Sequence, residues 1–256
     1  MPWPPRLTAQ RSRQAGERLA AALPDLPARE IPRLVRASWQ QARDAVRHAG
    51  DAVLDPKRLC RGLELEGWGE LVDAEQEAEA RGSGVVLPLV PFGDWPLALA
   101  ATALYRGRLA LGPSLASWPG AEVLVGRSAI TVEAVDDWPM AKLAAGQRLA
   151  VAGCQVAETV SATGSTRVDV PFLGTRLQIE DLPARLALAT GAALVVVAIE
   201  PGEKGRRRLW ARRIELPTPA VDSSGGSLPA LTRAWLEPIE AAVRRRPELW
   251  PWFLSG

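Results

Sequence analysis

The side chains best suited to proton-transfer chemistry are the single histidine, His48, and an aspartate, Asp94, in a turn that follows an apolar run. Histidine is a common general base because its pKa lies near working pH. A carboxylate beside the ring orients it and stabilises the imidazolium. The turn is flanked by Pro91 and Pro96, which offer neither a proton acceptor nor a carboxylate. Acid–base chemistry at this turn would therefore depend on His48 or Asp94.

Both residues also have ordinary structural explanations. Asp94 is expected to point into solvent, as most charged side chains do. It could instead cap the helix that begins at Trp95, since Asp is a favoured N-cap. His48 lies near the end of a predicted helix, where a histidine interacts favourably with the C-terminal dipole. We favour these explanations and keep a catalytic role for His48 as the alternative.

The composition is that of an ordinary folded protein. The chain has 256 residues, of which 23% are charged and 47% hydrophobic, and its formal net charge is +2. This charge gives no strong attraction to nucleic acid. Cys60 and Cys154 fit no disulfide or metal spacing, which suits a reducing compartment. We therefore expect no cofactor, no metal site and no nucleic-acid partner.

Helical and strand patterns alternate along most of the chain. Helices are predicted for residues 6–22, 28–50, 68–80, 95–105, 138–145, 182–190 and 228–246. Strands are predicted for residues 63–66, 85–90, 109–111, 122–125, 148–152, 193–199 and 206–216, the last two forming a hairpin. Gly191 is expected to cap the helix before it, and loops are expected at residues 157–168 and 223–227. The pattern predicts one α/β domain, residues 1–256, with a largely parallel central sheet and an N-terminal helical pair, residues 1–50, packed on it.

Four passages, in this order, carry a resemblance to a known family. Residues 17–27 lead from a helix into a Leu-Pro-Asp-Leu turn, and residues 91–96 read Pro-Phe-Gly-Asp-Trp-Pro. Residues 172–197 contain Phe-Leu-Gly, Leu-Pro-Ala-Arg-Leu-Ala and Thr-Gly-Ala, and residues 246–252 read Arg-Pro-Glu-Leu-Trp-Pro-Trp. Together they resemble the lipid A biosynthesis acyltransferases, the lauroyl/myristoyl branch of the lysophospholipid acyltransferase superfamily. The resemblance implies the glycerolipid-acyltransferase α/β fold.

The resemblance also implies what has been lost from the first motif. The family moves an acyl group from a thioester carrier to a sugar-lipid hydroxyl, and its motif reads His-Phe-Gly-Asn-Trp-Glu. The catalytic His and Glu of the family fall on Pro91 and Pro96, and the Asn falls on Asp94. A proline supplies neither base nor carboxylate, so no intact catalytic residue is expected here.

The second block of the family has changed as well. The arginine of its Gly-Arg-Pro segment is displaced by one position to Arg176, and an acid at a strand end becomes Cys154. Glu180 replaces a proline, and a carboxylate there would repel an anionic headgroup. The resemblance leaves six candidates for substrate binding: Phe92, Gly93, Trp95, Gly174, Arg176 and Arg185.

These losses lead us to interpret the chain as a pseudoenzyme linked to lipid or cell-envelope metabolism. It would act as a non-catalytic protein partner or bind a lipid or acyl chain, with channel walls supplied by Leu97, Leu99 and Ala100. The alternative is an active acyltransferase with a non-standard site. That enzyme would move an acyl group from a thioester carrier to a lysophospholipid or glycolipid hydroxyl.

Membrane contact is expected to be peripheral at most. The N-terminus lacks the apolar core of a signal peptide, and no apolar run approaches the roughly 20 residues of a spanning helix. The arginines at 206–208, 212–213 and 244–246 could bind phospholipid headgroups or form a solvated face, which we favour. Trp250, Trp252 and Phe253 could lie at a membrane interface, although the resemblance implies that this segment packs on the core. We expect a cytoplasmic protein, peripheral at most to the inner face of the membrane.

Overall fold

The described part of the chain is organised around a central sheet of seven strands. The computed structural model describes residues 7–54, 62–106, 109–111, 130–132, 138–152, 167–203, 206–216 and 227–251. The strands lie in the order β1 (Leu63–Glu66), β9 (Arg207–Ile214), β8 (Ala193–Pro201), β2 (Val85–Leu89), β5 (Arg148–Ala152), β3 (Leu109–Leu111) and β4 (Ile130–Val132). Neighbouring strands run parallel except for β8 and β9. The predicted largely parallel sheet and the β8–β9 hairpin are confirmed.

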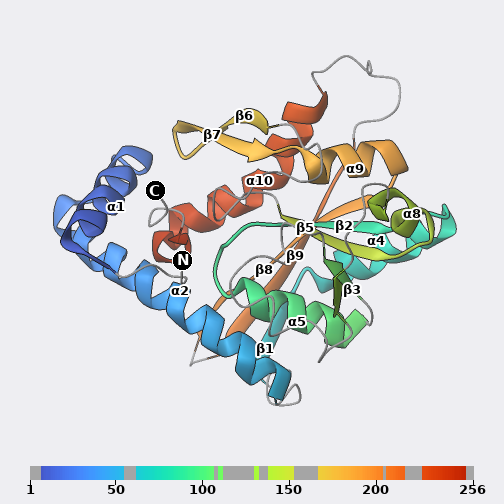
Figure 1. The fold of residues 1–256 in the computed structure, drawn as a ribbon, viewed down its shortest axis with the longest axis horizontal. Helices are drawn as coiled ribbons and strands as arrows, with labels where there is room; N and C mark the ends of the chain where they lie inside the picture. Colours follow the sequence, from blue (N-terminus) through green and yellow to red (C-terminus); the bar gives the residue numbers. More distant parts are fainter. Residues whose placement is uncertain are drawn as a thin grey trace.

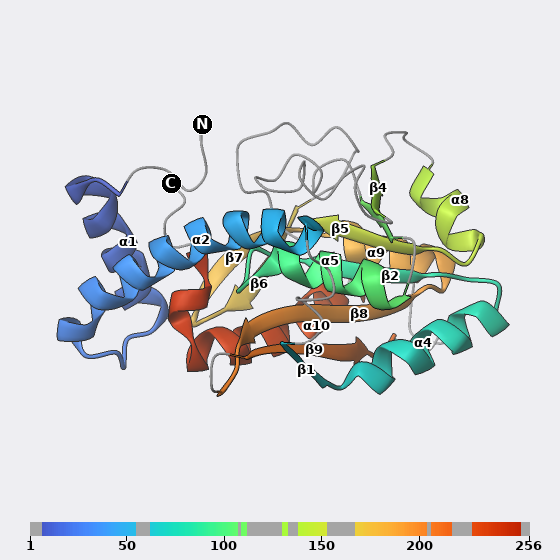
Figure 2. The same cartoon turned by 90° about the horizontal axis from the view of Figure 1, so that it is seen from below.

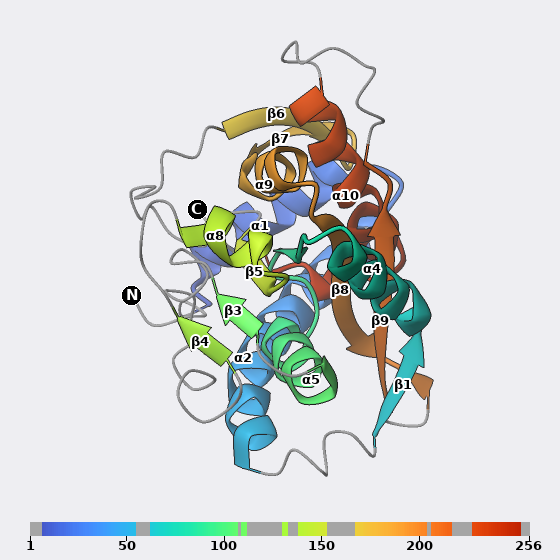
Figure 3. The same cartoon turned by 90° about the vertical axis from the view of Figure 1, so that its right-hand side faces the viewer.

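Helices flank this sheet on both faces (Figure 1). They are α4 (Trp68–Ala80), α5 (Trp95–Arg106), α8 (Trp138–Ala144), α9 (Leu182–Thr190) and α10 (Ser227–Arg245), with an N-terminal α1 (Ala9–Ala22) and α2 (Ile31–Leu54) and the short η1 (Ala28–Glu30) and η3 (Pro247–Leu249). Consecutive residues of a strand point to opposite faces. Arg207 of β9 contacts His48 of α2. The next residue of the strand, Arg208, binds Glu200, and Arg245 of α10 binds the same carboxylate. Figure 3 accordingly shows α2 and α5 on one side of the strands and α9 and α10 on the other.

The N-terminal helices begin and end at clear local signals. Thr8 caps α1 by accepting a hydrogen bond from the backbone N–H of Arg11, as a threonine N-cap does. Figure 2 shows α1 at one end of the molecule, with α2 running from it along α5, and α2 contacts both α5 and η3. Helix α2 continues to Leu54, past the predicted end at residue 50. His48 is therefore further from the helix terminus than the sequence suggested.

The middle of the sheet is the apolar core. All five residues of β2 and the first eight residues of β8 are buried. Such continuous apolar runs are typical of parallel strands covered by helices on both faces, which is why the sequence predicted them well. Gly191 ends α9 with φ +66°, and this confirms the predicted left-handed cap.

A second, two-stranded sheet was missed by the sequence analysis. Strands β6 (Arg167–Phe172) and β7 (Thr175–Glu180) form an antiparallel hairpin that packs on α10. The predicted loop at 157–168 is wrong for residues 167 and 168, which belong to β6, while residues 153–166 lie outside the described residues. Only four of the twelve strand residues are buried, among them Val170, Phe172 and Ile179, so the hairpin lacks a continuous apolar signal. The predicted strand 122–125 and most of the link 223–227 also lie outside the described residues.

Candidate functional site

The turn after β2 is fixed to two other parts of the chain. The backbone N–H of Gly93 donates to the carbonyl oxygen of Leu249 in η3 (2.8 Å), and that of Asp94 donates to Ile199 in β8 (3.1 Å). Gly93 has φ +57°, and a Cβ atom there would lie 2.0 Å from the Ile199 carbonyl oxygen. A side chain cannot occupy that space, so glycine is required by both conformation and contact.

The aromatic residues of this turn face inward. Phe92 is 1% exposed and Trp95 is 5% exposed, so both side chains pack in the core. Pro91 and Pro96 are buried as well. Proline at the second residue of α5 removes an N–H that has no partner inside the helix. The turn keeps the packing residues of the motif, and its two proline side chains carry no titratable group.

Asp94 does not point into solvent. It is 3% exposed, so the expectation of a solvated carboxylate was wrong. Its Oδ2 lies 2.6 Å from Nδ1 of His48, and its Oδ1 has no hydrogen-bond partner among the described residues. The side chain therefore bonds to α2 instead of capping α5. The helix that carries His48 begins 63 positions earlier in the sequence, so no local pattern signals this contact.

His48 does not interact with a helix terminus either. Its ring lies between Asp94 and Arg207, with Nε2 placed 3.1 Å from Nη2 of Arg207. The guanidinium can only donate, so Nε2 accepts and Nδ1 carries the hydrogen that is donated to Asp94. Both ring nitrogens thus have a hydrogen-bond partner. We refer to these three residues as the His48–Asp94–Arg207 cluster.

The three side chains of the cluster differ in burial, since Asp94 is buried and His48 and Arg207 are partly exposed. Burial raises the pKa of Asp94, and the hydrogen bond from His48 and the charge of Arg207 oppose this rise. The Nε atom of Arg207 lies 3.6 Å from Asp94 Oδ2. The side chains of His48 and Arg207 are 22% and 36% exposed, so solvent reaches both. Sequence reasoning missed Arg207 as a partner because only the β8–β9 hairpin brings it to this face.

This arrangement differs from a catalytic triad in one respect. In a triad the carboxylate orients one ring nitrogen and the other nitrogen is free to take the proton of the nucleophile. Here Arg207 occupies that second nitrogen, and a protonated ring would direct an N–H at the guanidinium. The geometry holds α2 against the turn and does not present a free base.

The hairpin and the motif turn meet at the same C-terminal segment. The rings of Phe172 and Trp250 are 5.3 Å apart between centroids, and Trp250 follows Leu249, which binds Gly93. Trp250 is 1% exposed, so it packs on the core. Trp252 and Phe253 lie outside the described residues. The structure therefore connects three of the four passages that carry the family resemblance.

Three of the proposed substrate-binding residues lie away from that contact. Gly174 and Arg176 are exposed on the β6–β7 hairpin, and Arg185 is on α9, 3.8 Å from Asp181. Glu180, expected to repel a headgroup, is 1% exposed. Cys154 lies outside the described residues. The assignment of these residues to substrate binding stays a prediction.

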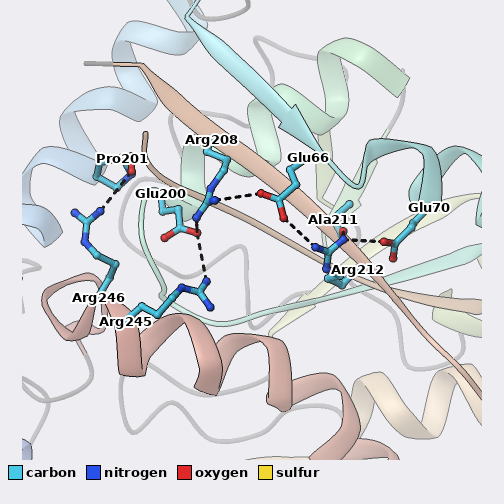
Figure 4. Close-up of polar contacts among 9 residues, drawn as sticks. All are labelled: Glu66, Glu70, Glu200, Pro201, Arg208, Ala211, Arg212, Arg245 and Arg246. Atoms are coloured by element: carbon cyan, nitrogen blue, oxygen red, sulfur yellow. Dashed lines mark hydrogen bonds and ion pairs between the residues drawn. The ribbon is translucent and has the colours of Figure 1, made fainter. Parts of the chain in front are cut away.

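The arginines of the hairpin face carboxylates. Arg208 binds Glu200 at 2.6 Å and Glu66 at 3.2 Å, and Arg212 binds Glu66 at 2.9 Å and Glu70 at 2.8 Å (Figure 4). Further pairs of the hairpin and of the C-terminal arginines include Arg206–Glu64, Arg213–Glu77, Arg244–Glu240, Arg245–Glu200 and Arg246–Glu248. Their charge is therefore balanced inside the protein itself.

Comparison with known proteins decides the family. The model of the bacterial lipid A biosynthesis acyltransferases matches residues 4–255. The chain belongs to this family. The resemblance drawn from the four passages is thereby confirmed, together with the acyltransferase-like α/β fold. No curated protein matches the chain.

Within this family fold, two further findings bear on the site. In the part of the chain that is described, no three His, Cys, Asp or Glu side chains gather as a metal site would require. No helix among the described residues combines the length and apolarity needed to span a bilayer.

Proposed function

We propose that this member of the bacterial lipid A biosynthesis acyltransferase family is a pseudoenzyme that acts as a non-catalytic partner in lipid or cell-envelope metabolism. The observation that carries the proposal is the state of the motif turn. Pro91 and Pro96 stand where the family resemblance places the base and the carboxylate. The imidazole and carboxylate found beside the turn are bound to each other and to Arg207.

The chemistry explains why these losses matter. A hydroxyl is a poor nucleophile, and a base must take its proton as it attacks the thioester carbonyl. Loss of a general base typically costs about two to four orders of magnitude in rate. His48 cannot supply the base in this arrangement because its Nε2 already accepts from Arg207. A fold can keep its packing after its chemistry is gone, because function depends on the site and not on the scaffold.

Packing around α5 supports a partner role over acyl binding. An open acyl channel would leave the side chains of its walls partly exposed. Leu97, Leu99 and Ala100 are 2%, 1% and 3% exposed. Their side chains are thus covered by protein atoms, and an unfilled channel beside them would be a destabilising void. The surface, and not this interior, is then the part of the molecule available for a functional contact.

The first test is an acyl transfer assay on the purified protein. Acyl-CoA and acyl carrier protein serve as donors, and lysophospholipid and glycolipid as acceptors. We expect no turnover above that of the buffer. Turnover abolished by His48→Ala or Asp94→Ala would reveal a relocated base and overturn the proposal. The double variant Pro91→His with Pro96→Glu tests whether the fold gains transferase activity when the histidine and glutamate of the family motif are introduced.

The second test concerns the partner. The tagged protein is captured from its native host, and native mass spectrometry is run on the same preparation. We expect a stoichiometric protein of lipid or envelope metabolism and no copurified lipid. Copurified lipid without a protein partner would favour the acyl-binding role instead.

A further inference from the structure

The side of α2 that faces solvent carries a row of arginines. Exposed residues recur along η1 and α2 at steps of three and four positions, which places them on one side of the helix. They are Arg29, Arg33, Arg36, Gln40, Arg43 and Arg47. We call the five arginines of this set the α2 arginine row. At about 1.5 Å of rise per residue the row is about 27 Å long, and Figure 1 shows α2 along one edge of the molecule.

The opposite side of α2 is the side that packs on the protein. Leu34, Val35, Ser38, Ala42 and Ala45 are each at most 4% exposed, and they lie about half a turn from the arginines. The described large hydrophobic side chains that are exposed all lie outside α1 and α2. A helix that lies in a membrane interface buries its apolar side in the lipid. The apolar side of α2 is already buried in the protein.

Three members of the row have no carboxylate partner among the described residues. Arg29 and Arg36 make no side-chain hydrogen bond or ion pair there. Arg43 lies over the ring of Trp39, 4.8 Å from its centroid, and this cation–π contact leaves the positive charge without a counter-charge. The arginines of β9, in contrast, each face a carboxylate.

The other two members of the row have partners that solvent screens. Arg33 lies 3.3 Å from Glu30, and Arg47 lies 3.4 Å from Asp44. The two arginine side chains are 67% and 69% exposed. Exposed ion pairs of this kind contribute little to stability, so a carboxylate of another protein can replace Glu30 or Asp44 at low cost.

The row belongs to the part of the chain that holds its positive net charge. Residues 1–54 contain nine arginines and five acidic residues and carry +4, whereas residues 55–256 carry −2. A local excess of one sign attracts a partner surface of the opposite sign and steers its approach. Charge complementarity therefore indicates an acidic partner for this side of α2.

We propose that the α2 arginine row is the surface through which this protein binds its partner, and that the partner is a protein which presents a row of aspartate and glutamate side chains along a helix. This inference rests on the partner role proposed above and names its contact surface. Carboxylates three and four positions apart on a helix repeat at the interval of the arginines. Two helices side by side then bring guanidinium groups against carboxylates, with which they form strong paired hydrogen bonds.

Titration of the purified full-length protein with a synthetic peptide tests the surface. The probe is a labelled helical peptide whose glutamates match the spacing of the row, and the control peptide has the same composition with its glutamates spread around the helix. Binding is followed by fluorescence anisotropy at about 0.1 M salt, where charges more than about 10 Å apart are largely screened. We expect the matched peptide to bind at least about fivefold more tightly than the control peptide. Equal affinities, or no binding of the matched peptide, would overturn the proposal.

Variants of the unpaired arginines locate the contact. The triple variant Arg29→Gln, Arg36→Gln and Arg43→Gln should bind the matched peptide roughly tenfold more weakly, since each exposed charge pair contributes up to about fivefold. Its control loses the same charge at three side chains elsewhere that are 50–63% exposed, Arg81→Gln, Arg206→Gln and Arg244→Gln. The control should weaken binding by less than about twofold. An equal effect of both triple variants would show that net charge, and not the row, attracts the peptide.

A charge reversal separates loss of the contact from loss of the fold. The variant Arg29→Glu, Arg36→Glu and Arg43→Glu should not bind the glutamate peptide but should bind a peptide with lysine in place of each glutamate. Because the three side chains are exposed, we expect its circular dichroism to match that of the wild type. Binding to neither peptide by the folded variant would contradict the proposal.

Vesicles of phosphatidylglycerol are the comparison that distinguishes a membrane from a protein partner. Binding to vesicles that requires the row, without binding of the matched peptide, would assign the row to a membrane surface and overturn the protein partner. The acyl transfer assay is independent of these results. Turnover would refute the pseudoenzyme and leave the peptide contact standing, whereas no turnover and no peptide binding would refute the contact surface alone.

Discussion

Replacement of His48 by alanine tests whether the cluster stabilises the native protein. The ring donates a 2.6 Å hydrogen bond to a carboxylate that is 3% exposed and whose second oxygen lacks a partner within the described part of the chain. A hydrogen bond to a charged group contributes about 1.5–3 kcal/mol, and removal of one member of a buried pair costs about 3–5 kcal/mol. The ring is 22% exposed, so water can partly replace it. We expect His48→Ala to lose about 2–3 kcal/mol of unfolding free energy near neutral pH.

The pH dependence of this loss has a definite sign. Burial raises the pKa of Asp94, so its ionised form is disfavoured in the native state. A group with a raised native pKa contributes stability below its unfolded pKa and loses that contribution as pH rises through the native pKa. The deficit of His48→Ala should therefore be largest at about pH 8 and shrink in mild acid, where Asp94 takes up a proton and no charge is left buried.

The assay is urea unfolding followed by tryptophan fluorescence, which the ten tryptophans of the chain make sensitive. His48→Gln is the matched control, because its amide can donate to Asp94 and accept from Arg207, and it should lose less than about 1 kcal/mol. A deficit for His48→Ala below about 0.5 kcal/mol near pH 8 would refute the reasoning. So would a deficit that grows as the pH falls.

Two further pairs of variants follow from the geometry. Glu200→Gln removes a carboxylate that is 1% exposed and binds Arg208, so it should lower the free energy of unfolding by about 2–3 kcal/mol. Glu66→Gln changes a side chain that is 43% exposed and should lower it by less than about 1 kcal/mol. Equal losses of the two variants in urea unfolding would contradict the role given to burial. Gly93→Ala places a Cβ 2.0 Å from a carbonyl oxygen and should prevent a native fold or destabilise it by more than about 3 kcal/mol. Gly174→Ala, at a residue with φ +73° and open space around it, should destabilise the fold by about 1–2 kcal/mol in thermal unfolding. Similar melting temperatures of the two variants would show that the turn at Gly93 can move.

Local patterns in the sequence determined most of the helices and strands. The apolar run of β8 and the alternation of helices with strands specify covered parallel strands, because burial on both faces demands apolar side chains throughout. The order of four short passages determined the family. The β6–β7 hairpin escaped prediction because only four of its twelve strand residues are buried, so neither strand carries a continuous apolar run. Its Leu173–Gly174 turn has positive φ at both positions, and Leu173 is a residue that seldom adopts such a conformation.

The sequence by itself determined that prolines stand at 91 and 96, the positions to which the family resemblance assigns the catalytic pair, and a proline side chain carries no titratable group. Only the tertiary structure decided what His48 and Asp94 do. They are 46 residues apart, and Arg207 is 159 residues from His48. Hydrogen bonding and desolvation depend on distance in space, which neither composition nor periodicity encodes. The sequence does not distinguish a solvated carboxylate from a buried one. Asp94 is buried because α2 and β9 pack against the turn.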